Sequence, residues 1–284
     1  MKAIVKYPKE GLSFEEVSMP EPKPDEVLIK TKLTSICGTD LHIYKWDEWA
    51  KKNVPAPMVI GHEFVGEIAA LGSQVTDHFI GERVCGEGHF TCGHCLGCRN
   101  GQLHLCSNTI GLGIRSPGCY AEYFTFPARN LYPLPDTITD ELGAIFDPFG
   151  NAVHTALSAP LAGADVLITG AGPIGIMAAA VAKHAGAHCI VITDINDWRL
   201  NLASQMGATL AVNVAKTPLK EATRGIDFTV GMEMSGHPQA LSDQLHLLQP
   251  GSHLALLGIL PPNTAIDWDL IVFKMLHIKG IYGS

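Results

Sequence analysis

The chain has 284 residues, of which 46% are hydrophobic and 17% charged, as expected for a folded protein of about two domains. A formal net charge of −8 argues against a large nucleic-acid-binding surface. The longest apolar run, residues 174–182, is too short to cross a bilayer, and the N-terminus lacks the apolar core of a signal peptide. We therefore expect a cytoplasmic protein with reduced cysteines and no nucleic-acid or membrane partner.

Residues 1–147 have the pattern of a β-rich domain. Segments 26–36 and 64–72 are predicted strands, and prolines and glycines interrupt the chain at 19–26 and 54–62. Two short segments of this domain carry side chains that suit zinc: 35–42, which contains Cys37, and 60–68, which contains His62 and Glu63. Three protein ligands and one open position define a catalytic zinc site. From spacing alone, a small buried cysteine and a satisfied His-Glu pair remain open alternatives.

Four cysteines lie close together in one polar stretch, at Cys92, Cys95, Cys98 and Cys106. Four thiolates complete a closed tetrahedral zinc shell, which is the arrangement of a structural site and cannot bind substrate. A ferredoxin-type iron–sulfur cluster is the nearest alternative, but its fourth cysteine follows after three residues and precedes a proline. Here seven residues intervene, and Ser107 follows. Redox or disulfide use is the remaining alternative.

From residue 148 onward, predicted strands alternate with predicted helices. The strands are 165–170, 188–194, 227–234, 252–258 and 277–283, and the helices are 173–186, 196–207 and 238–248. This alternation is typical of a parallel, doubly wound sheet. The sequence thus predicts an α/β protein with domains at 1–147 and 148–284.

A glycine-rich turn separates the first strand and helix of the second domain. Gly170, Gly172 and Gly175 form G-x-G-x-x-G, which predicts a dinucleotide site when a strand precedes it and a helix follows. Asp194 ends the next strand, where a carboxylate would hold the 2′-hydroxyl of the adenosine ribose and so favour NAD over NADP. Arg199 weakens this preference because an arginine can accommodate a 2′-phosphate. A ligand-free turn is the alternative for the glycines, and a strand-end turn residue for Asp194.

Longer stretches carry a resemblance to a known family. Residues 61–84 resemble the signature of the zinc-dependent medium-chain alcohol dehydrogenases, and the four cysteines and the glycine turn follow in the family's order. Residues 36–49, 87–95, 145–157 and 170–187 resemble in particular the members that oxidise L-threonine. The resemblance implies a GroES-like catalytic domain, a Rossmann NAD-binding domain and a homotetramer.

The same resemblance implies roles for single residues. Cys37, His62 and Glu63 match the catalytic zinc ligands, and the four cysteines match the structural zinc, which makes two zinc ions per chain. Thr39 and His42 match a proton relay; the alternatives are a helix cap and a surface histidine. Asp147 matches an acidic position that supports proton movement, and its alternative is an N-cap followed by Pro148 at N1. The positions that match the lining of NAD are Ile174, Asp194, Arg199, Leu257, Gly258, Ile259, Ile281 and Tyr282.

The implied reaction is the NAD-dependent oxidation of L-threonine to L-2-amino-3-oxobutanoate. A polyol or 2,3-butanediol-type secondary alcohol is the alternative substrate, and a non-enzymatic NAD-binding or zinc-stabilised protein is the alternative of a different class. The resemblance also implies a C-terminal return segment of several dozen residues, which is absent after residue 284. We expect its absence to leave apolar surface uncovered and to lower stability.

Overall fold

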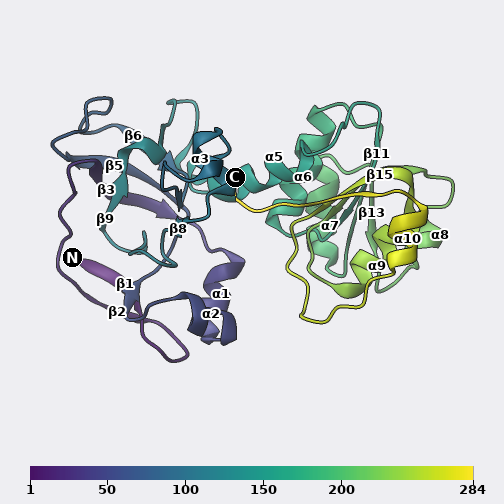
Figure 1. The fold of residues 1–284 in the computed structure, drawn as a ribbon, viewed down its shortest axis with the longest axis horizontal. Coiled ribbons are helices and arrows are strands. Elements are labelled where there is room, and N and C mark those ends of the chain that lie inside the picture. The colour runs from purple at the N-terminus through teal and green to yellow at the C-terminus, as the bar shows by residue number, and fades with distance from the viewer. Residues whose placement is uncertain (284) are drawn as a thin grey trace. The chain divides into compact units, whose positions relative to one another are not determined.

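The computed structural model describes residues 1–283, which pack into two compact units (Figure 1). One unit is Met1–Pro148, and the other runs from Phe149 to the end of the described residues. Within this described part, every helix is too short or too polar to cross a membrane.

The N-terminal unit is built on antiparallel sheets. A three-stranded sheet has the order β2 (Ser13–Glu16), β1 (Lys2–Lys6), β4 (Met58–Val59), and a two-stranded sheet pairs β7 (His89–Phe90) with β8 (Ile110–Gly111). The larger sheet has the order β10 (Leu131–Pro133), β6 (Arg83–Gly86), β5 (Phe64–Leu71), β3 (Glu26–Thr34), β9 (Tyr123–Pro127). Short helices connect them: α1 (Gly38–Lys45), α2 (Glu48–Asn53), α3 (Leu96–Arg99), α4 (Asp140–Gly143), and the 3-10 turns η1 (Leu103–Leu105) and η2 (Ala128–Asn130).

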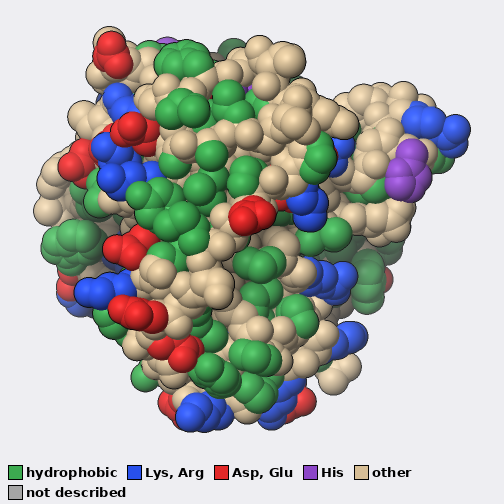
Figure 2. Space-filling view, turned by 90° about the vertical axis from the view of Figure 1, so that its left-hand side faces the viewer, with side chains coloured by type: hydrophobic (Ala, Val, Ile, Leu, Met, Phe, Trp, Pro, Cys, Tyr) green, Lys and Arg blue, Asp and Glu red, His purple; other side chains and the backbone are tan. Residues whose placement is uncertain are grey.

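An aromatic cluster forms the core under the five-stranded sheet. The rings of Phe64, Phe124 and Phe126 meet edge to face, with centroids 4.8 to 6.2 Å apart. Strand alternation places all three on the same face, where aromatic pairs of this geometry stabilise beyond their buried area. The outer surface differs: in Figure 2, which looks onto the left-hand side of Figure 1, hydrophobic side chains lie among acidic and basic ones.

A buried lysine ties β1 to the helix α1. Lys6 is 0% exposed, and its ammonium donates hydrogen bonds to the carbonyls of Lys9 at 2.5 Å, Gly11 at 3.1 Å and Tyr44 at 3.0 Å. Burial lowers the pKa of Lys6. Because Tyr44 lies in the last turn of α1, this bond satisfies a helix-end carbonyl and fixes the helix against the sheet.

The C-terminal unit is the predicted doubly wound sheet. Its six strands are parallel, in the order β13 (Leu210–Asn213), β12 (Cys189–Asp194), β11 (Asp165–Thr169), β14 (Phe228–Glu233), β15 (Leu248–Leu256), β16 (His277–Gly280). The helices are α5 (Phe146–Ala156), α6 (Pro173–His184), α7 (Asp197–Met206), α8 (Leu219–Ala222), α9 (Pro238–Leu247) and α10 (Trp268–Phe273). The order reverses beside β11, and ligands of such sheets bind outside the carboxyl ends of the strands at that point.

Both faces of this sheet are covered. Along β11, Val166 and Ile168 belong to one apolar cluster, which includes the alanine-rich face of α6, whereas Leu167 belongs to a second cluster with residues of α9. A strand buried on both faces reads as a continuous apolar run, which is why 165–170 was recognisable in the sequence. Strand β13 and helices α8 and α10 are four to six residues long and lack a clear periodic pattern, so the sequence did not predict them.

Candidate functional site

Strand pairing brings the three candidate catalytic zinc ligands together. The antiparallel register of β3 and β5 places Thr34 opposite Phe64, so the segment after β3 meets the segment before β5. Cys37 lies on the first segment as the N-cap of α1, and His62 and Glu63 lie on the second. One ligand atom from each lies within 4.8 Å of the others. Thiolate, imidazole and carboxylate are all zinc ligands, and three of them leave one coordination position open, so the residues fit a catalytic zinc.

A further carboxylate supports this group from behind. Asp40 is 5% exposed, and its Oδ2 accepts hydrogen bonds from the Cys37 amide at 2.9 Å and the Tyr120 hydroxyl at 2.7 Å. Its Oδ1 lies 3.8 Å from Nδ1 of His62, too far for a hydrogen bond, and both atoms are buried without one. A carboxylate on one ring nitrogen is the usual support of a histidine that binds metal through the other.

The electrostatics of this site favour a cation. Burial by itself would lower the pKa of His62, but a hydrogen bond with Cys37 and the charge of Asp40 outweigh it and raise the pKa to about 9. Burial, followed by the charge of Glu87, raises the pKa of Asp147 to about 6. Both pKa shifts indicate that several negatively charged groups lie close together where water has limited access. A divalent metal ion would balance this negative charge.

The two relay candidates share one helix. Thr39 and His42 both lie in α1, three residues apart and hence on one side of it. The sulfur of Cys37 lies 3.6 Å from the Thr39 hydroxyl, which places Thr39 beside the donor group, that is, the candidate zinc ligands Cys37, His62 and Glu63. Cys37 is the N-cap, so the alternative of Thr39 as the cap is wrong. The His42 side chain is 59% exposed.

Two further residues lie near the candidate zinc ligands, and the sequence analysis assigned neither of them to a site. Ligand atoms of Glu87, His89 and Asp147 lie within 4.8 Å of one another, and Nδ1 of His89 lies 2.6 Å from Oε1 of Glu87. Both Glu87 and His89 interact electrostatically with Asp147, and Asp147 with His62 and Glu63. The spacing Glu-x-His at a short strand, which places two side chains on one face, was the available signal.

The alternative for Asp147 is also corrected. Helix α5 begins at Phe146, so Asp147 lies inside its first turn and is not the N-cap, and Pro148 follows at the third position. A carboxylate in the first turn interacts favourably with the helix dipole. Asp147 therefore has a structural reason to be there as well as its place beside Glu87 and His89.

The four cysteines form a compact group of sulfurs. Cys95 and Cys98 have sulfurs 3.5 Å apart, and those of Cys92 and Cys106 are 3.6 Å apart. A disulfide would need about 2.05 Å. Sulfurs at about 2.3 Å from a central zinc ion are separated by about 3.8 Å in a tetrahedron, so the group fits zinc. A hydrogen bond from Asn108 lowers the pKa of Cys92 to about 5, which favours the thiolate there, whereas desolvation raises the pKa of Cys98 to about 11.

The lobe around these cysteines has no packed interior. Among residues 91–111, all of which the structure describes, every side chain is exposed or half-buried. Its apolar members are open to solvent, at 70% for Leu96, 51% for Leu103 and 57% for Leu105. A metal ion bound by the four cysteines would offset the chain entropy that this segment does not recover by apolar burial.

The glycine turn has the geometry that a dinucleotide requires. Gly170 has φ +101°, a backbone conformation that other residues rarely adopt. Gly172 is the N-cap of α6, and a Cβ there would meet no atom within 4 Å, whereas a Cβ on Gly175 would lie 2.0 Å from the carbonyl oxygen of Gly170. The first amides of α6, after Pro173, point out of the helix end, where a pyrophosphate binds.

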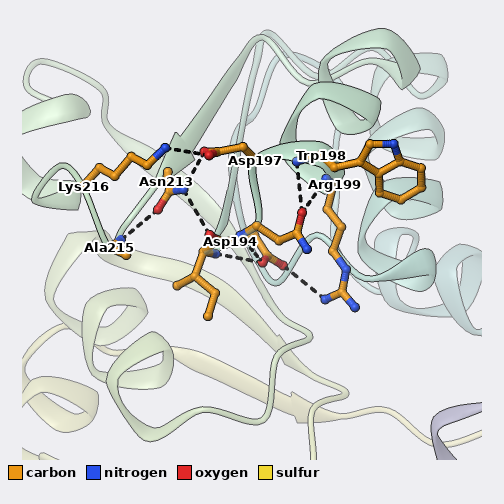
Figure 3. A network of polar contacts seen from close by, with 9 residues as sticks. Asp194, Asp197, Trp198, Arg199, Asn213, Ala215 and Lys216 are labelled. Atoms are coloured by element: carbon orange, nitrogen blue, oxygen red, sulfur yellow. Dashed lines mark hydrogen bonds and ion pairs between the residues drawn. The ribbon is translucent and has the colours of Figure 1, made fainter.

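Asp194 lies against this turn, where its Oδ2 accepts a hydrogen bond from the Ala171 amide at 2.9 Å. Its Oδ1 accepts hydrogen bonds from the amides of Ile195 at 2.8 Å and Asn196 at 2.9 Å, and Figure 3 shows Asp194 within the network of polar contacts at the start of α7. Nη1 of Arg199 lies 3.9 Å from Oδ2 of Asp194. The arginine thus neighbours the carboxylate that would repel a 2′-phosphate. Asp197 anchors the start of α7 to β13, through Asn213 at 2.6 Å and Lys216 at 2.6 Å.

A cavity of about 760 Å³ adjoins this turn within the C-terminal unit. Gly170 and Asp194 line it together with Ser235, His237 and Lys220. Residues 257–259 and 281–282 do not line it but follow the carboxyl ends of β15 and β16, on the same edge of the sheet. Ile281 is buried, while Ile259 and Tyr282 are exposed.

Glu233 is a third residue that sequence reasoning missed. It is 0% exposed at the end of β14, and its side chain accepts hydrogen bonds from the amides of Ser235 at 2.9 Å and Gly236 at 3.1 Å. Its carbonyl accepts from the amides of Leu257 at 2.9 Å and Gly258 at 3.0 Å. One buried carboxylate residue therefore holds two loops at the carboxyl edge, including 257–259. Unlike Asp194, Glu233 stands in no motif with the glycine turn, so no sequence pattern singled it out.

Family models match both parts of the chain. Residues 23–136 match the alcohol dehydrogenase GroES-like domain, and residues 173–284 match the zinc-binding dehydrogenase model. The chain belongs to the zinc-binding alcohol dehydrogenases. The expected family and the expected GroES-like and Rossmann folds are thereby confirmed.

Relatives of known name align with this dehydrogenase over its whole length. It is 59% identical to the L-threonine 3-dehydrogenase of Protochlamydia amoebophila and 57% identical to that of Vibrio cholerae, in each case over 100% of this chain and 84% of the relative. Among solved structures, an Escherichia coli CFT073 alcohol dehydrogenase with NADH is 34% identical, with a TM-score of 0.92 over 99% of this chain and 83% of that one. A Sinorhizobium meliloti zinc-binding dehydrogenase bound to NADP is 30% identical, with a TM-score of 0.93 over 100% and 84%.

For this zinc-binding dehydrogenase, we predict that Cys98→Ser removes one of two zinc ions per chain. The lobe at 91–111 should become a site of rapid limited proteolysis, and the melting temperature should fall, because metal binding replaces apolar burial there. Cys189→Ser, a cysteine outside the lobe, is the matched control and should keep both ions. Metal analysis and proteolysis measure this; equal stability together with a selective loss of turnover would contradict a structural role.

Two glycine variants should separate folding from cofactor binding. We predict that Gly175→Ala destabilises the protein by about 1–3 kcal/mol, because its Cβ would overlap the Gly170 carbonyl. Gly172→Ala should melt like the wild type, since open space surrounds that position, yet bind NADH about tenfold or more weakly, a loss of about 1.4 kcal/mol or more. Thermal melts and NADH fluorescence titrations measure the two effects. Equal NADH affinity of Gly172→Ala and wild type would contradict the assignment of the pyrophosphate site.

Proposed function

We propose that this protein is an L-threonine 3-dehydrogenase, which oxidises L-threonine to L-2-amino-3-oxobutanoate with NAD⁺. The observation that carries the proposal is the 55–59% identity, over the full chain, to proteins of that name. The solved alcohol and polyol dehydrogenases are much less similar, at 25–34% identity.

Cys37, His62 and Glu63 would hold the catalytic zinc, which supplies Lewis-acid activation of the substrate hydroxyl, and bound NAD⁺ supplies the hydride acceptor. The chain's own task is to remove the hydroxyl proton. Thr39, beside Cys37, takes that proton and passes its own toward His42 on the same helix, and the exposed imidazole releases it to solvent. Asp147, which interacts electrostatically with His62 and Glu63, assists proton movement.

The group of Glu87, His89 and Asp147 is proposed to contact the amino-acid part of the substrate. A zwitterion carries an ammonium group, and carboxylates that are partly removed from water bind such a group strongly. Glu87 and Asp147 supply two carboxylates close to the donor group, and Glu87 orients His89 through a 2.6 Å contact. A neutral polyol would have no use for this charge.

The nucleotide site is proposed to take NAD⁺ in preference to NADP⁺. Gly170, Gly172, Ile174 and Gly175 receive the pyrophosphate side, and Asp194 receives the ribose hydroxyls. The remaining contacts are assigned to Arg199, Leu257, Gly258, Ile259, Ile281 and Tyr282. Arg199 lies 3.9 Å from Asp194, so its charge is partly balanced and less available to a phosphate.

Cys92, Cys95, Cys98 and Cys106 would hold the second, structural zinc. We also propose a cytoplasmic location and a homotetramer. A cytoplasmic location suits four thiols that must stay reduced to bind metal. The homotetramer is proposed from the family resemblance.

A secondary-alcohol dehydrogenase for polyols or 2,3-butanediol is the second candidate. The observation in its favour is the fold, since the 2R,3R-butanediol dehydrogenase of Bacillus subtilis is 29% identical with a TM-score of 0.89 over 99% of this chain and 84% of that one. The lower identity makes it the weaker candidate.

The direct test is a side-by-side assay of NADH formation from L-threonine, sorbitol and 2,3-butanediol, with the zinc content measured on the same sample. We expect threonine to be oxidised with the highest kcat/KM and two zinc ions per chain. Faster oxidation of either diol or polyol would replace the proposal by the second candidate.

Cofactor choice gives a separate prediction. Wild-type enzyme should prefer NAD⁺ to NADP⁺ by about 10²-fold in kcat/KM, because placing a phosphate beside Asp194 costs several kcal/mol and each 1.4 kcal/mol is tenfold. Asp194→Ser should relax the preference by weakening NAD⁺ and admitting NADP⁺. Asp197→Ser, which alters a nearby carboxylate that bonds Lys216 instead, is the control. A wild-type preference for NADP⁺ would mean that Arg199 dominates this end of the site.

A further inference from the structure

A tight turn after α1 brings a carboxylate back to the candidate relay histidine. Trp46 has φ +55° and ends the helix, with its amide bonded to the Ile43 carbonyl at 3.2 Å. The next amide, of Asp47, lies 3.4 Å from the carbonyl of His42. The reversal places Oδ2 of Asp47 2.5 Å from Nδ1 of His42.

The Asp47 carboxylate is held in this position from its other side. Asp47 is the N-cap of α2, and its Oδ1 accepts a hydrogen bond from the amide of Ala50 at 3.0 Å. Ala50 is 0% exposed, so the start of α2 is anchored in the core. One oxygen of Asp47 is thus committed to the helix, and the other is directed at the imidazole. Trp49, also in α2, adds a ring 6.2 Å from that of His42.

We infer that Asp47 is a positioning residue for the proton relay: it fixes the tautomer and the orientation of His42. The inference rests on the proposed function, in which His42 accepts and releases the substrate's proton. An ionised carboxylate can only accept hydrogen bonds, so Nδ1 of His42 must carry the hydrogen. Nε2 then presents its lone pair as the proton acceptor, and the carboxylate stabilises the imidazolium that forms, as in other His-Asp pairs.

Packing alone cannot do this for His42. The side chain is 59% exposed, and an imidazole in water samples both tautomers and several rotamers. The Asp47 contact is therefore what distinguishes a directed proton acceptor from a surface histidine. A purely structural role for Asp47, as the cap of α2, is the alternative that the experiment must separate.

Three substitutions make that separation. Asp47→Asn keeps the cap, since asparagine caps as well as aspartate, but turns an N–H group or a neutral oxygen toward His42. Asp47→Ser keeps a cap of the same kind and is too short to reach the ring. Glu48→Gln removes the same charge one residue away, from a side chain that is 90% exposed and bonds Lys51, and is the matched control.

We expect Asp47→Asn and Asp47→Ser to lower kcat about tenfold, a part of the about 10²–10⁴-fold that a positioned proton-transfer group contributes. KM for NAD⁺ and the melting temperature should change little, and Glu48→Gln should match the wild type. In a His42→Ala background, already slowed, Asp47→Asn should have no further effect, because its partner is gone. An unchanged kcat for both Asp47 variants, or an equal further loss in the His42→Ala background, would overturn the inference.

The assays use whichever of threonine, sorbitol and 2,3-butanediol the wild-type enzyme oxidises best, since any alcohol must lose its proton. Failure with threonine alone therefore contradicts the proposed function and leaves the Asp47 test intact. A turnover-independent measurement is the ring orientation of His42 in crystal structures of zinc-loaded wild type and Asp47→Ser. The ring should be fixed in the first and rotated or disordered in the second; an identical ordered ring in both would contradict the inference.

Discussion

The buried carboxylate of Asp40 is the constraint around which the N-terminal unit assembles its donor group. Its partners come from separate parts of the chain: the Cys37 amide at the start of α1, the Tyr120 hydroxyl, and the ring of His62 at 3.8 Å. A buried charge must find donors or a cation, so these segments have little freedom to separate. Gly61, with φ +93° and a hypothetical Cβ only 2.2 Å from the Tyr120 ring, shows how closely the segment before β5 is pressed onto this group.

The two proposed metal sites of the chain differ in what surrounds them. Cys37, His62 and Glu63 are supported by a second layer of polar groups: Asp40 behind the histidine, and Ser35, whose hydroxyl contacts the Glu63 carboxylate. The sulfurs of the four-cysteine group accept hydrogen bonds from backbone amides and from the side chain of Asn108. A supported site with three ligands retains its geometry when a fourth ligand exchanges, which catalysis needs, whereas a closed shell of four has nothing to exchange.

The order of predicted strands and helices along the chain was sufficient to predict the fold. The spacing of residues within short motifs was sufficient to predict part of the candidate site. Two motifs each predict one kind of site: the G-x-G-x-x-G turn between an apolar strand and a helix predicts a dinucleotide site, and the four closely spaced cysteines predict a metal site. Glu87, His89 and Glu233 were missed, because their role depends on strand register and on loops that meet in space. The contact of Asp47 with His42 was not predicted either, because it depends on a turn through an unusual φ at Trp46, and tryptophan is not a residue that signals such a turn. The helix boundary at Asp147 was misjudged because Asp-Pro is a common helix start.

The uncored lobe at 91–111 has a thermodynamic consequence. Elsewhere in the protein, order is maintained by buried area, which is a fixed property of the chain. With the proposed structural zinc bound, the lobe would be ordered by a ligand instead, and the free energy gained from a ligand grows with the logarithm of its free concentration. The folded population of this one segment would then depend on the free zinc concentration around the protein, whereas that of the neighbouring sheets would not.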